Sequence, residues 1–512
     1  MIFPSEKEFL TLTKKGNLIP VAREILGDLD TPVSAYYKIA EKSRYSFLLE
    51  SVEGEEKVAR FSFLASDPEL IIQSKDHALE ITRCHDGRSR KETQTIHDTP
   101  LHPIRQLMAG YRFVPVKGLP RFCGGLVGYM GYDLVRFFER LPDRPKDDLK
   151  LPDMILALAK SLIIFDHLNH KIQVVQCVHV DARASLKAKR TAYRKAVRQI
   201  EATVELIQCP LDERLINKKR RSSGPRAAGR VRSNFSCAQF ERIVREAKKK
   251  IRAGDIIQTV LSQRFEVPLK TDGFHVYRML RSLNPSPYMY FLNFNDIQII
   301  GSSPEMLVRC EDGLVETRPI AGTRPRGKNE QEDQRLETEL LRDPKERAEH
   351  LMLVDLGRND LGRVARQGTV HVPQFMTIER YSHVMHIVSS VTGRLKKGKD
   401  AFDVLAAAFP AGTLSGAPKI RAMEIIDELE NVSRGPYAGC ICYFSFSGNF
   451  DSCITIRTIV AHRGKAYIQA GAGIVADSRP KKEYIETVNK AKAQIQALNL
   501  AVQQFGPSAK NH

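Results

Sequence analysis

Short apolar or alternating runs recur through the whole chain, and this pattern constrains its fold more than any other feature. Strands are predicted at 44–49, 59–63, 70–72, 162–165, 172–180, 256–267, 288–294, 297–301 and 307–310. Helices are predicted between them at 103–111, 182–208 and 237–253, and a last helix begins at Pro480. Runs of strands with helices grouped between them are typical of the α+β class with antiparallel sheets.

A basic segment at 218–233 divides the chain. It holds seven lysine and arginine residues and no acidic residue, and glycine and proline interrupt it. This composition is typical of a solvated linker or loop, so we expect an N-terminal domain at 1–217 and a second domain at 234–512. No aromatic side chain is interleaved with the basic ones, which argues against a nucleic-acid interface there.

The composition excludes several classes of protein. The 512 residues are 42% hydrophobic, which is enough for one large core or for a few ordinary domains. The N-terminus lacks a cationic stretch followed by an apolar one, and Lys160 interrupts the longest apolar run, 154–165. We therefore expect neither export nor a membrane span. Nine cysteines without a C-x-x-C motif fit structural thiols in a reducing compartment, the cytoplasm, and the net charge of +19 favours anionic metabolites as ligands.

Two pairs of glutamates, each spaced E-x-x-E, open two helices far apart in the sequence. The pairs are Glu346 with Glu349 and Glu483 with Glu486, each shortly after a proline. Residues three apart share a helix face, and a proline at the first helical position places that face in the first turn. Carboxylates held this close repel one another, and a hard divalent cation such as Mg²⁺ would relieve the repulsion. The alternative is that acidic first turns simply complement the helix dipole.

Further polar residues lie where a core would not require them. Gln258 interrupts the apolar run 254–265, and Glu305 ends another strand. A buried amide needs hydrogen-bond partners, so Gln258 indicates a polar environment. A cationic loop at 316–326 and a glycine-rich segment at 409–419 follow. The latter lacks the spacing of a P-loop, and its glycines favour close approach of backbone N–H groups to a carboxylate.

Two motifs are weaker than their spacing suggests. The segment 471–476 matches G-x-G-x-x-A, but the next helix begins too late for a dinucleotide site. His383 and His386 suggest zinc, but the run 381–391 is β-branched and alternating, and residues three apart on a strand face opposite sides. We expect one histidine to point into a site and the other away. The alternative is a core histidine with satisfied hydrogen bonds.

Five motifs in order make the chain similar to the chorismate-utilising enzymes. They are 319–324 (PIAGTR), 349–360 (EHLMLVDLGRND), 412–419 (GTLSGAPK), 471–477 (GAGIVAD) and the E-x-x-E-x-x-x-K that ends at Lys490. The resemblance covers nearly the whole chain and implies large antiparallel β-sheets packed as a sandwich with flanking helices. Within the family, the chain resembles the large subunits of anthranilate synthases most, because it also carries 48–51 (LLES) and 284–289 (NPSPYM).

The resemblance implies an activity and a set of site residues. The implied reaction converts chorismate and ammonia to anthranilate and pyruvate, the first committed step of tryptophan biosynthesis, with Mg²⁺ held by Glu346, Glu349, Glu483 and Glu486. The implied catalytic residues are Glu305 as general acid, His386, which assists loss of the C2 proton, and Thr413. The implied chorismate contacts are Gln258, Ala321, Gly322, Thr323, Tyr437, Arg457, Gly471, Ala472, Gly473 and Lys490. L-Tryptophan would act as feedback inhibitor at Glu50, Ser51, Pro287, Tyr288 and Met289.

Two positions separate the close relatives. Aminodeoxychorismate synthases carry a lysine nucleophile where this chain has Ala321, and isochorismate and salicylate synthases carry a water-activating lysine where it has Gln258. Both lysines are missing here, so the resemblance implies an external amine as nucleophile. The alternative of an aminodeoxyisochorismate or aminodeoxychorismate synthase, which forms an aminated product without eliminating pyruvate, stays open. Outside the enzymes, the alternative is a module that binds an aromatic metabolite or RNA without chemistry.

The source of ammonia is predicted to be another protein. No glutaminase nucleophile of the Gly-x-Cys-x-Gly type occurs in the chain, and Cys123 is the nearest approach to one. We therefore expect a separate glutamine amidotransferase subunit, component II, and neither a membrane nor a nucleic-acid partner. The chain contains no tryptophan, which fits a protein that must be made when tryptophan is scarce.

Overall fold

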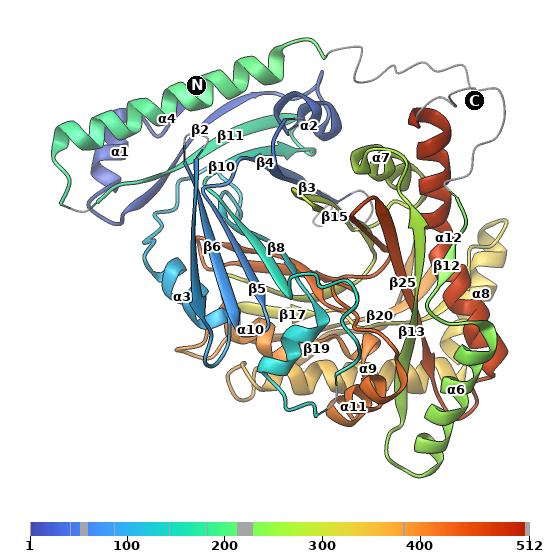
Figure 1. The fold of residues 1–512 in the computed structure, drawn as a ribbon. Helices are drawn as coiled ribbons and strands as arrows, with labels where there is room; N and C mark the ends of the chain where they lie inside the picture. The colour runs from blue at the N-terminus through green and yellow to red at the C-terminus, as the bar shows by residue number, and fades with distance from the viewer. Residues whose placement is uncertain are drawn as a thin grey trace, which may run out of the picture.

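Two large antiparallel sheets face each other, and helices cover their outer faces (Figure 1). The computed structural model describes residues 2–40, 42–51, 60–85, 88–142, 144–181, 183–211, 229–381 and 384–506. Most of the predicted basic linker, 218–228, lies outside the described residues, and so does His383. The predicted α+β sandwich is confirmed.

The first sheet has 13 strands within the described ranges. In spatial order they are β1 (Ile2–Phe3), β2 (Leu18–Leu26), β11 (Lys171–His179), β10 (Ser161–Asp166), β4 (Phe61–Ser66), β3 (Tyr45–Glu50), β14 (Tyr288–Phe294), β15 (Ile297–Ser303), β24 (Thr458–His462), β25 (Lys465–Ile474), β13 (Gln258–Pro268) and β12 (Arg232–Ser233), with β21 (Gly416–Ala417) also paired to β13. Every pairing is antiparallel. The β3–β14 pairing joins the two halves of the chain.

The second sheet has 12 strands in the part of the chain that the structure describes. In spatial order they are β18 (Ile320–Pro325), β20 (Val384–Arg394), β17 (Leu314–Thr317), β16 (Met306–Glu311), β23 (Phe450–Ile454), β22 (Cys440–Ser445), β8 (Gly125–Met130), β9 (Met154–Ala159), β5 (Leu70–Lys75), β6 (Ala78–His85) and β7 (Arg88–Thr95), with β19 (His371–Arg380) also paired to β20. Here too every pairing is antiparallel, and β22–β8 joins the halves. Residues before and after the basic segment thus contribute to both sheets, and the division into 1–217 and 234–512 stays a prediction.

Helices lie on both outer faces of the sandwich. They are α1 (Glu6–Leu12), α2 (Pro32–Ala40), α3 (Leu101–Ala109), α4 (Leu186–Gln208), α6 (Cys237–Arg252), α7 (Gly273–Leu283), α8 (Glu330–Arg342), α9 (Pro344–Gly362), α10 (Ala401–Ala408), α11 (Lys419–Leu429) and α12 (Pro480–Phe505), with short 3₁₀ turns η1 (Tyr132–Phe137) and η2 (Gly412–Leu414). Helices α4, α7 and α12 pack on the first sheet, and α9 and α10 on the second. No helix in the described residues is long and apolar enough to cross a membrane.

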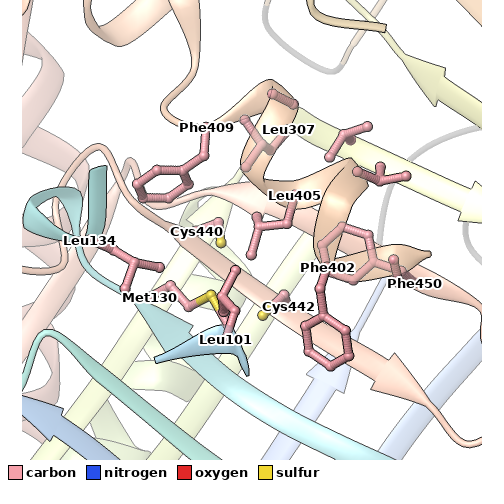
Figure 2. Packing of buried hydrophobic residues seen from close by; sticks show 14 of the residues in the cluster. Leu101, Met130, Leu134, Leu307, Phe402, Leu405, Phe409, Cys440, Cys442 and Phe450 are labelled. Atoms are coloured by element: carbon pink, nitrogen blue, oxygen red, sulfur yellow. The ribbon is translucent and has the colours of Figure 1, made fainter. Parts of the chain in front are cut away.

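Side chains of β22 alternate between two hydrophobic cores, one on each face of the second sheet. Cys440 and Cys442 face the core beneath α3 and α10, where Leu101 and Leu405 meet them (Figure 2). Ile441 faces the other way, into the core between the two sheets. Side chains of a strand point alternately to opposite faces, so an unbroken apolar run suits a strand buried on both sides. All nine cysteines are free thiols, and the interpretation of 440–442 as a buried strand is confirmed.

Candidate active site

A cavity of about 750 Å³ lies where strands of both sheets meet the first turns of α9 and α12. Strands β13 and β25 of the first sheet and β18 and β20 of the second contribute to its wall. The predicted catalytic, substrate and metal residues that line it are Gln258, Glu305, Ala321, Gly322, Thr323, Glu346, Glu349, His386, Thr413, Tyr437, Arg457, Gly471, Gly473, Glu483, Glu486 and Lys490.

Ala472 is the predicted substrate residue that the structure does not bring to this cavity. Its side chain is fully buried in a separate core cluster with Phe240 and Leu261. Gly471 and Gly473 flank it on β25, and neighbouring residues of a strand face opposite sides. The motif 471–473 is contiguous in sequence, but only its two glycines face the cavity.

These two glycines present backbone groups to the cavity. Their partners across the ladder, Ser262 and Val260, donate their own N–H groups elsewhere, to a glutamate carboxylate at 2.8 Å and a loop carbonyl at 3.0 Å. Both are therefore non-hydrogen-bonded pairs, in which the glycine N–H and C=O point away from β13. On the side of β25 opposite β13, β24 pairs with β25 only as far as Ile468, so within the described residues the edge of β25 beyond Ile468 has no paired strand.

Close packing explains why residue 471 is a glycine. A Cβ there would lie 2.7 Å from the hydroxyl of Tyr437, and a Cβ at Gly473 would lie 2.8 Å from the amide nitrogen of Gln258. Both distances are too short for a side chain. Lys490 Nζ donates to the Gly471 carbonyl at 3.0 Å, which holds its ammonium group at this edge. The edge therefore combines backbone donors with a fixed cation, a combination that suits a carboxylate ligand.

Glu305 follows the end of β15 and has the ionisation behaviour of an acid. Burial raises its pKa to about 7, while a hydrogen bond from Thr413 and the charge of Lys490 act in the opposite direction. Thr413 Oγ1 donates to Glu305 Oε1 at 2.8 Å, from the 3₁₀ turn η2. A carboxyl group with a pKa near neutrality is able to donate a proton under physiological conditions.

His386 lies on β20 and points into the cavity, as expected of one of the two histidines. Its Nδ1 lies 3.0 Å from the Gly322 carbonyl oxygen, and burial lowers its pKa. A carbonyl only accepts hydrogen bonds, so Nδ1 carries the proton and Nε2 keeps its lone pair. A neutral imidazole with a free Nε2 lone pair is suited to accept a proton.

The four glutamates lie near the starts of α9 and α12, as predicted, with Glu346 and Glu483 in the first turns and Glu349 and Glu486 one turn further on. Asp343 caps α9 by accepting from the N–H of Glu346 at 3.2 Å, whereas α12 begins at Pro480 without a side-chain cap. Burial raises the pKa of Glu349, and the charge of Glu346 raises it further. Burial also raises the pKa of Glu483, with a smaller contribution from Glu486. A neighbouring carboxylate therefore helps to destabilise the charged forms of Glu349 and Glu483, as the spacing of each pair predicts.

The chemistry of this donor set fits a hard divalent cation. Carboxylate oxygens are the ligands that Mg²⁺ prefers, and a cation would offset both the burial and the repulsion that raise the pKa values of Glu349 and Glu483. Glu346 is held by Arg324 at 3.3 Å and Glu486 by Lys490 at 2.7 Å. In the described ranges, no three acidic, histidine or cysteine side chains converge closely enough to form a ready-made metal site. Gathering the glutamates around an ion therefore requires side-chain rotation out of these ion pairs.

Arg457 provides a second cation, partly buried, at the cavity wall. Its backbone has φ of 53°, in the left-handed region that is costly for residues with a Cβ. Its Nη1 donates to the Lys490 carbonyl at 3.1 Å, which fixes the guanidinium beside the third turn of α12. A strained backbone at a cavity-lining cation is typical of a binding site.

A second cavity of about 840 Å³ is lined by all five residues predicted to contact an inhibitor, Glu50, Ser51, Pro287, Tyr288 and Met289. Glu50 pairs with Met289 across β3 and β14. The Glu50 carboxylate accepts from Arg281 at 3.0 and 3.1 Å and from the Tyr277 hydroxyl. Aromatic rings form part of the wall, where Phe122 and Tyr443 stack at 4.2 Å. Pro287 lines both cavities, which places them on either side of one segment.

Sequence reasoning missed residues that hold the catalytic segments in place. Arg434, fully enclosed, donates to the carbonyls of Leu414 at 2.8 Å and Val260 at 2.7 Å, and its guanidinium lies over the ring of Tyr437. It thereby joins η2, β13 and a cavity residue. Leu414 and Val260 are distant from Arg434 in sequence, so these two contacts give no local signal. Asp360 and Lys419 form an ion pair at 2.8 Å. Both lie in motifs named above, so their opposite charges could have predicted this pair.

The chain belongs to the family of chorismate binding enzymes, whose family model matches residues 46–496. It is 49% identical over 510 residues to anthranilate synthase component 1 of Acetivibrio thermocellus, covering 98% of this chain and 99% of that protein. It is also 49% identical over 502 residues to anthranilate synthase component 1 of Aquifex aeolicus, covering 97% of this chain and 98% of that protein.

Solved structures agree with this assignment. Anthranilate synthase component I from Streptococcus pneumoniae superposes with a TM-score of 0.74 at 38% identity, covering 92% of this chain and 99% of that one. The menaquinone-specific isochorismate synthase from Escherichia coli superposes with a TM-score of 0.67 at 18% identity, covering 96% of this chain and 98% of that one, and supports the fold alone.

Proposed function

We propose that the protein is the large subunit of an anthranilate synthase, which converts chorismate and ammonia to anthranilate and pyruvate. The observation that carries the proposal is a single cavity that holds Glu305 with a pKa near 7, a neutral His386 and the two glutamate pairs. Relatives named anthranilate synthase component 1 match over nearly the whole chain, which supports the same activity.

Substrate carboxylates would be bound at the edge of β25. Lys490 and Arg457 supply two cations there, and Gly471 and Gly473 supply backbone N–H groups. Charge-assisted hydrogen bonds of this kind are about twice as strong as neutral ones. They would orient the ring so that its C4 hydroxyl faces Glu305.

Glu305 would act in the first chemical step. Ammonia forms a bond to C2 while the C4 oxygen leaves, and the proton of Glu305 converts that leaving group to water. Hydroxide leaves poorly, so a positioned acid contributes about 10²–10⁴-fold. Thr413 holds the carboxyl group in place through its 2.8 Å hydrogen bond.

His386 would act in the second step. The aminated intermediate loses its C2 proton and the enolpyruvyl group leaves as pyruvate, which makes the ring aromatic. The Nδ1 bond to Gly322 directs the lone pair of Nε2 to the cavity, where it can accept that proton. A neutral imidazole is needed for this role, and burial keeps its pKa low.

Glu346, Glu349, Glu483 and Glu486 would hold Mg²⁺. The bound ion supplies Lewis-acid polarisation and a template for the ring carboxylate. Gln258 and Ala321 line the same cavity and bring no amine or general base to C2. The nucleophile would therefore come from outside this chain, as ammonia from a partner glutaminase. We also infer a cytoplasmic location, because all nine cysteines are free thiols.

The second cavity would bind L-tryptophan as feedback inhibitor. Its stacked aromatic rings suit an indole, and the Glu50 carboxylate suits an amino group. The Ser51 hydroxyl is buried and has no hydrogen-bond partner among the described residues, so a ligand group would satisfy it.

The test is an assay of the purified chain with chorismate, Mg²⁺ and ammonium. We expect anthranilate, detected by its fluorescence, and an equal amount of pyruvate. Glutamine should replace ammonium only after addition of the glutaminase subunit. An aminated product without pyruvate would identify an enzyme that stops at the intermediate, and no conversion at all would refute the proposal.

A further inference from the structure

Gln494 is a buried amide on the catalytic cavity that none of the steps above uses. Its side chain is fully buried on α12, yet it lines the cavity. Neither its Oε1 nor its Nε2 has a hydrogen-bond partner among the described residues. An amide buried without partners costs about 1–3 kcal/mol per unsatisfied group, so such a residue in a cavity wall calls for a ligand.

The position of Gln494 on α12 places it at the inner end of the site. Glu486, Lys490 and Gln494 are spaced by four residues and share one face of the helix, each about 6 Å further along its axis. Gln494 therefore lies beyond the metal and carboxylate groups. The segment 284–287 lines the same cavity.

A polar hollow adjoins the cavity along the same helix. It has a volume of about 560 Å³ and shares Asn284, Arg457, Glu486 and Lys490 with the catalytic cavity. Ala493, the neighbour of Gln494 in sequence, lines the hollow. A small polar molecule thus has a hydrophilic approach beside α12.

The two ends of the amide restrict what can bind there. Nε2 donates only and Oε1 accepts only, so a ligand that satisfies both must carry a lone pair and an N–H or O–H group. A carboxylate satisfies only Nε2, and an ammonium ion satisfies only Oε1. Substrate carboxylates already have Lys490 and Arg457, which bind them more strongly. The remaining candidates are small neutral molecules, ammonia or water.

We propose that Gln494 forms a binding site for neutral ammonia, which ammonia occupies before it reaches C2 of the substrate. Nε2–H donates to the ammonia lone pair, and an ammonia N–H donates to Oε1. Ammonium has no lone pair, so the amide selects the nucleophilic form. This inference rests on the proposed function, because only an amination uses such a ligand.

The test compares Gln494→Leu with Gln496→Leu, the same change at an exposed position of the same helix. In the chain alone, with saturating chorismate, we expect Gln494→Leu to raise the KM for ammonium about three- to tenfold, the effect of one or two neutral hydrogen bonds. The KM for chorismate and the kcat at saturating ammonium should stay unchanged, as should all constants of the control. Gln494→Met, which keeps the chain length, is the second variant.

Each of the other outcomes refutes the proposal that Gln494 binds ammonia. An unchanged KM for ammonium in Gln494→Leu and Gln494→Met means that the amide binds only water. A raised KM for chorismate alone makes Gln494 a substrate contact. If the unmodified chain forms no anthranilate from chorismate and ammonium, the proposed function fails first, so the two failures are distinct.

Discussion

The two cavities differ in how their charges are compensated. In the catalytic cavity, burial and neighbouring carboxylates raise the pKa values of Glu349 and Glu483, and burial raises that of Glu305 to about 7. In the second cavity, most charged side chains are already held in ion pairs. Glu50 accepts two hydrogen bonds from Arg281, and Arg309 pairs with Asp451 at 3.0 Å.

This difference separates a site for chemistry from a site for recognition. Groups with displaced pKa values can move protons or bind cations, because their charged forms are poorly stabilised without a ligand. Groups held in pairs offer fixed shape and direction at little electrostatic cost on binding. Pro287 lines both cavities, so the two kinds of site meet at one segment.

The largest effect is expected from Glu305→Gln. The amide keeps the shape but cannot donate the proton, so anthranilate formation should fall about 10²–10⁴-fold. Initial rates by anthranilate fluorescence measure this. Tryptophan binding at the second cavity should persist, and it can be followed by the ligand's own fluorescence because the chain contains no tryptophan. Full activity in this variant would remove Glu305 from the mechanism.

The second prediction concerns Glu349→Gln. Loss of one carboxylate of the pair should raise the Mg²⁺ concentration for half-maximal rate by at least about tenfold. The control is Glu330→Gln, an exposed acidic residue in the first turn of α8, which should leave the Mg²⁺ dependence unchanged. Equal Mg²⁺ dependence in both variants would favour the helix-dipole interpretation of the E-x-x-E pairs.

The third prediction tests whether the second cavity can be changed without an effect on catalysis. Ser51→Leu fills part of the second cavity and removes a buried hydroxyl, so the inhibition constant for tryptophan should rise at least about tenfold. The catalytic constants should not change, because Ser51 does not line the catalytic cavity. Rates with and without tryptophan test this. A parallel loss of catalysis would mean that the two cavities are not separable.

The sequence predicted the elements where its periodicity was local. Strand β14 was predicted at its observed bounds, and α12 begins at the predicted Pro480. The helix predicted at 182–208 begins later, at Leu186, because Ser185 caps it by accepting from the N–H of Ala188. The order of strands was not predictable, since the pairings β3–β14 and β22–β8 join segments that are far apart in the chain.

The site was predictable as a list of residues but not as an arrangement. The motifs and the family resemblance predicted many of the residues that line the cavity, but not Gln494. Ala472 was predicted and does not line it, since contiguous motif letters ignore strand alternation. No motif contains the contacts of Arg434, because its partners Leu414 and Val260 come from separate elements. The ion pair of Glu346 with Arg324 depends equally on tertiary structure.

The smallest effect is expected from Thr413→Val, which tests how the pKa of Glu305 is set. The Thr413 hydroxyl donates to Glu305, which stabilises the carboxylate and lowers its pKa. Removing this hydrogen bond should raise the pKa of Glu305 above its value of about 7. The acid form then persists to higher pH, so the alkaline limb of the rate profile should move up by about one third to one pH unit. Thr413→Ser keeps the hydroxyl and should keep the profile of the unmodified chain, whereas a downward shift in the valine variant would contradict the assignment of Glu305 as the titrating acid.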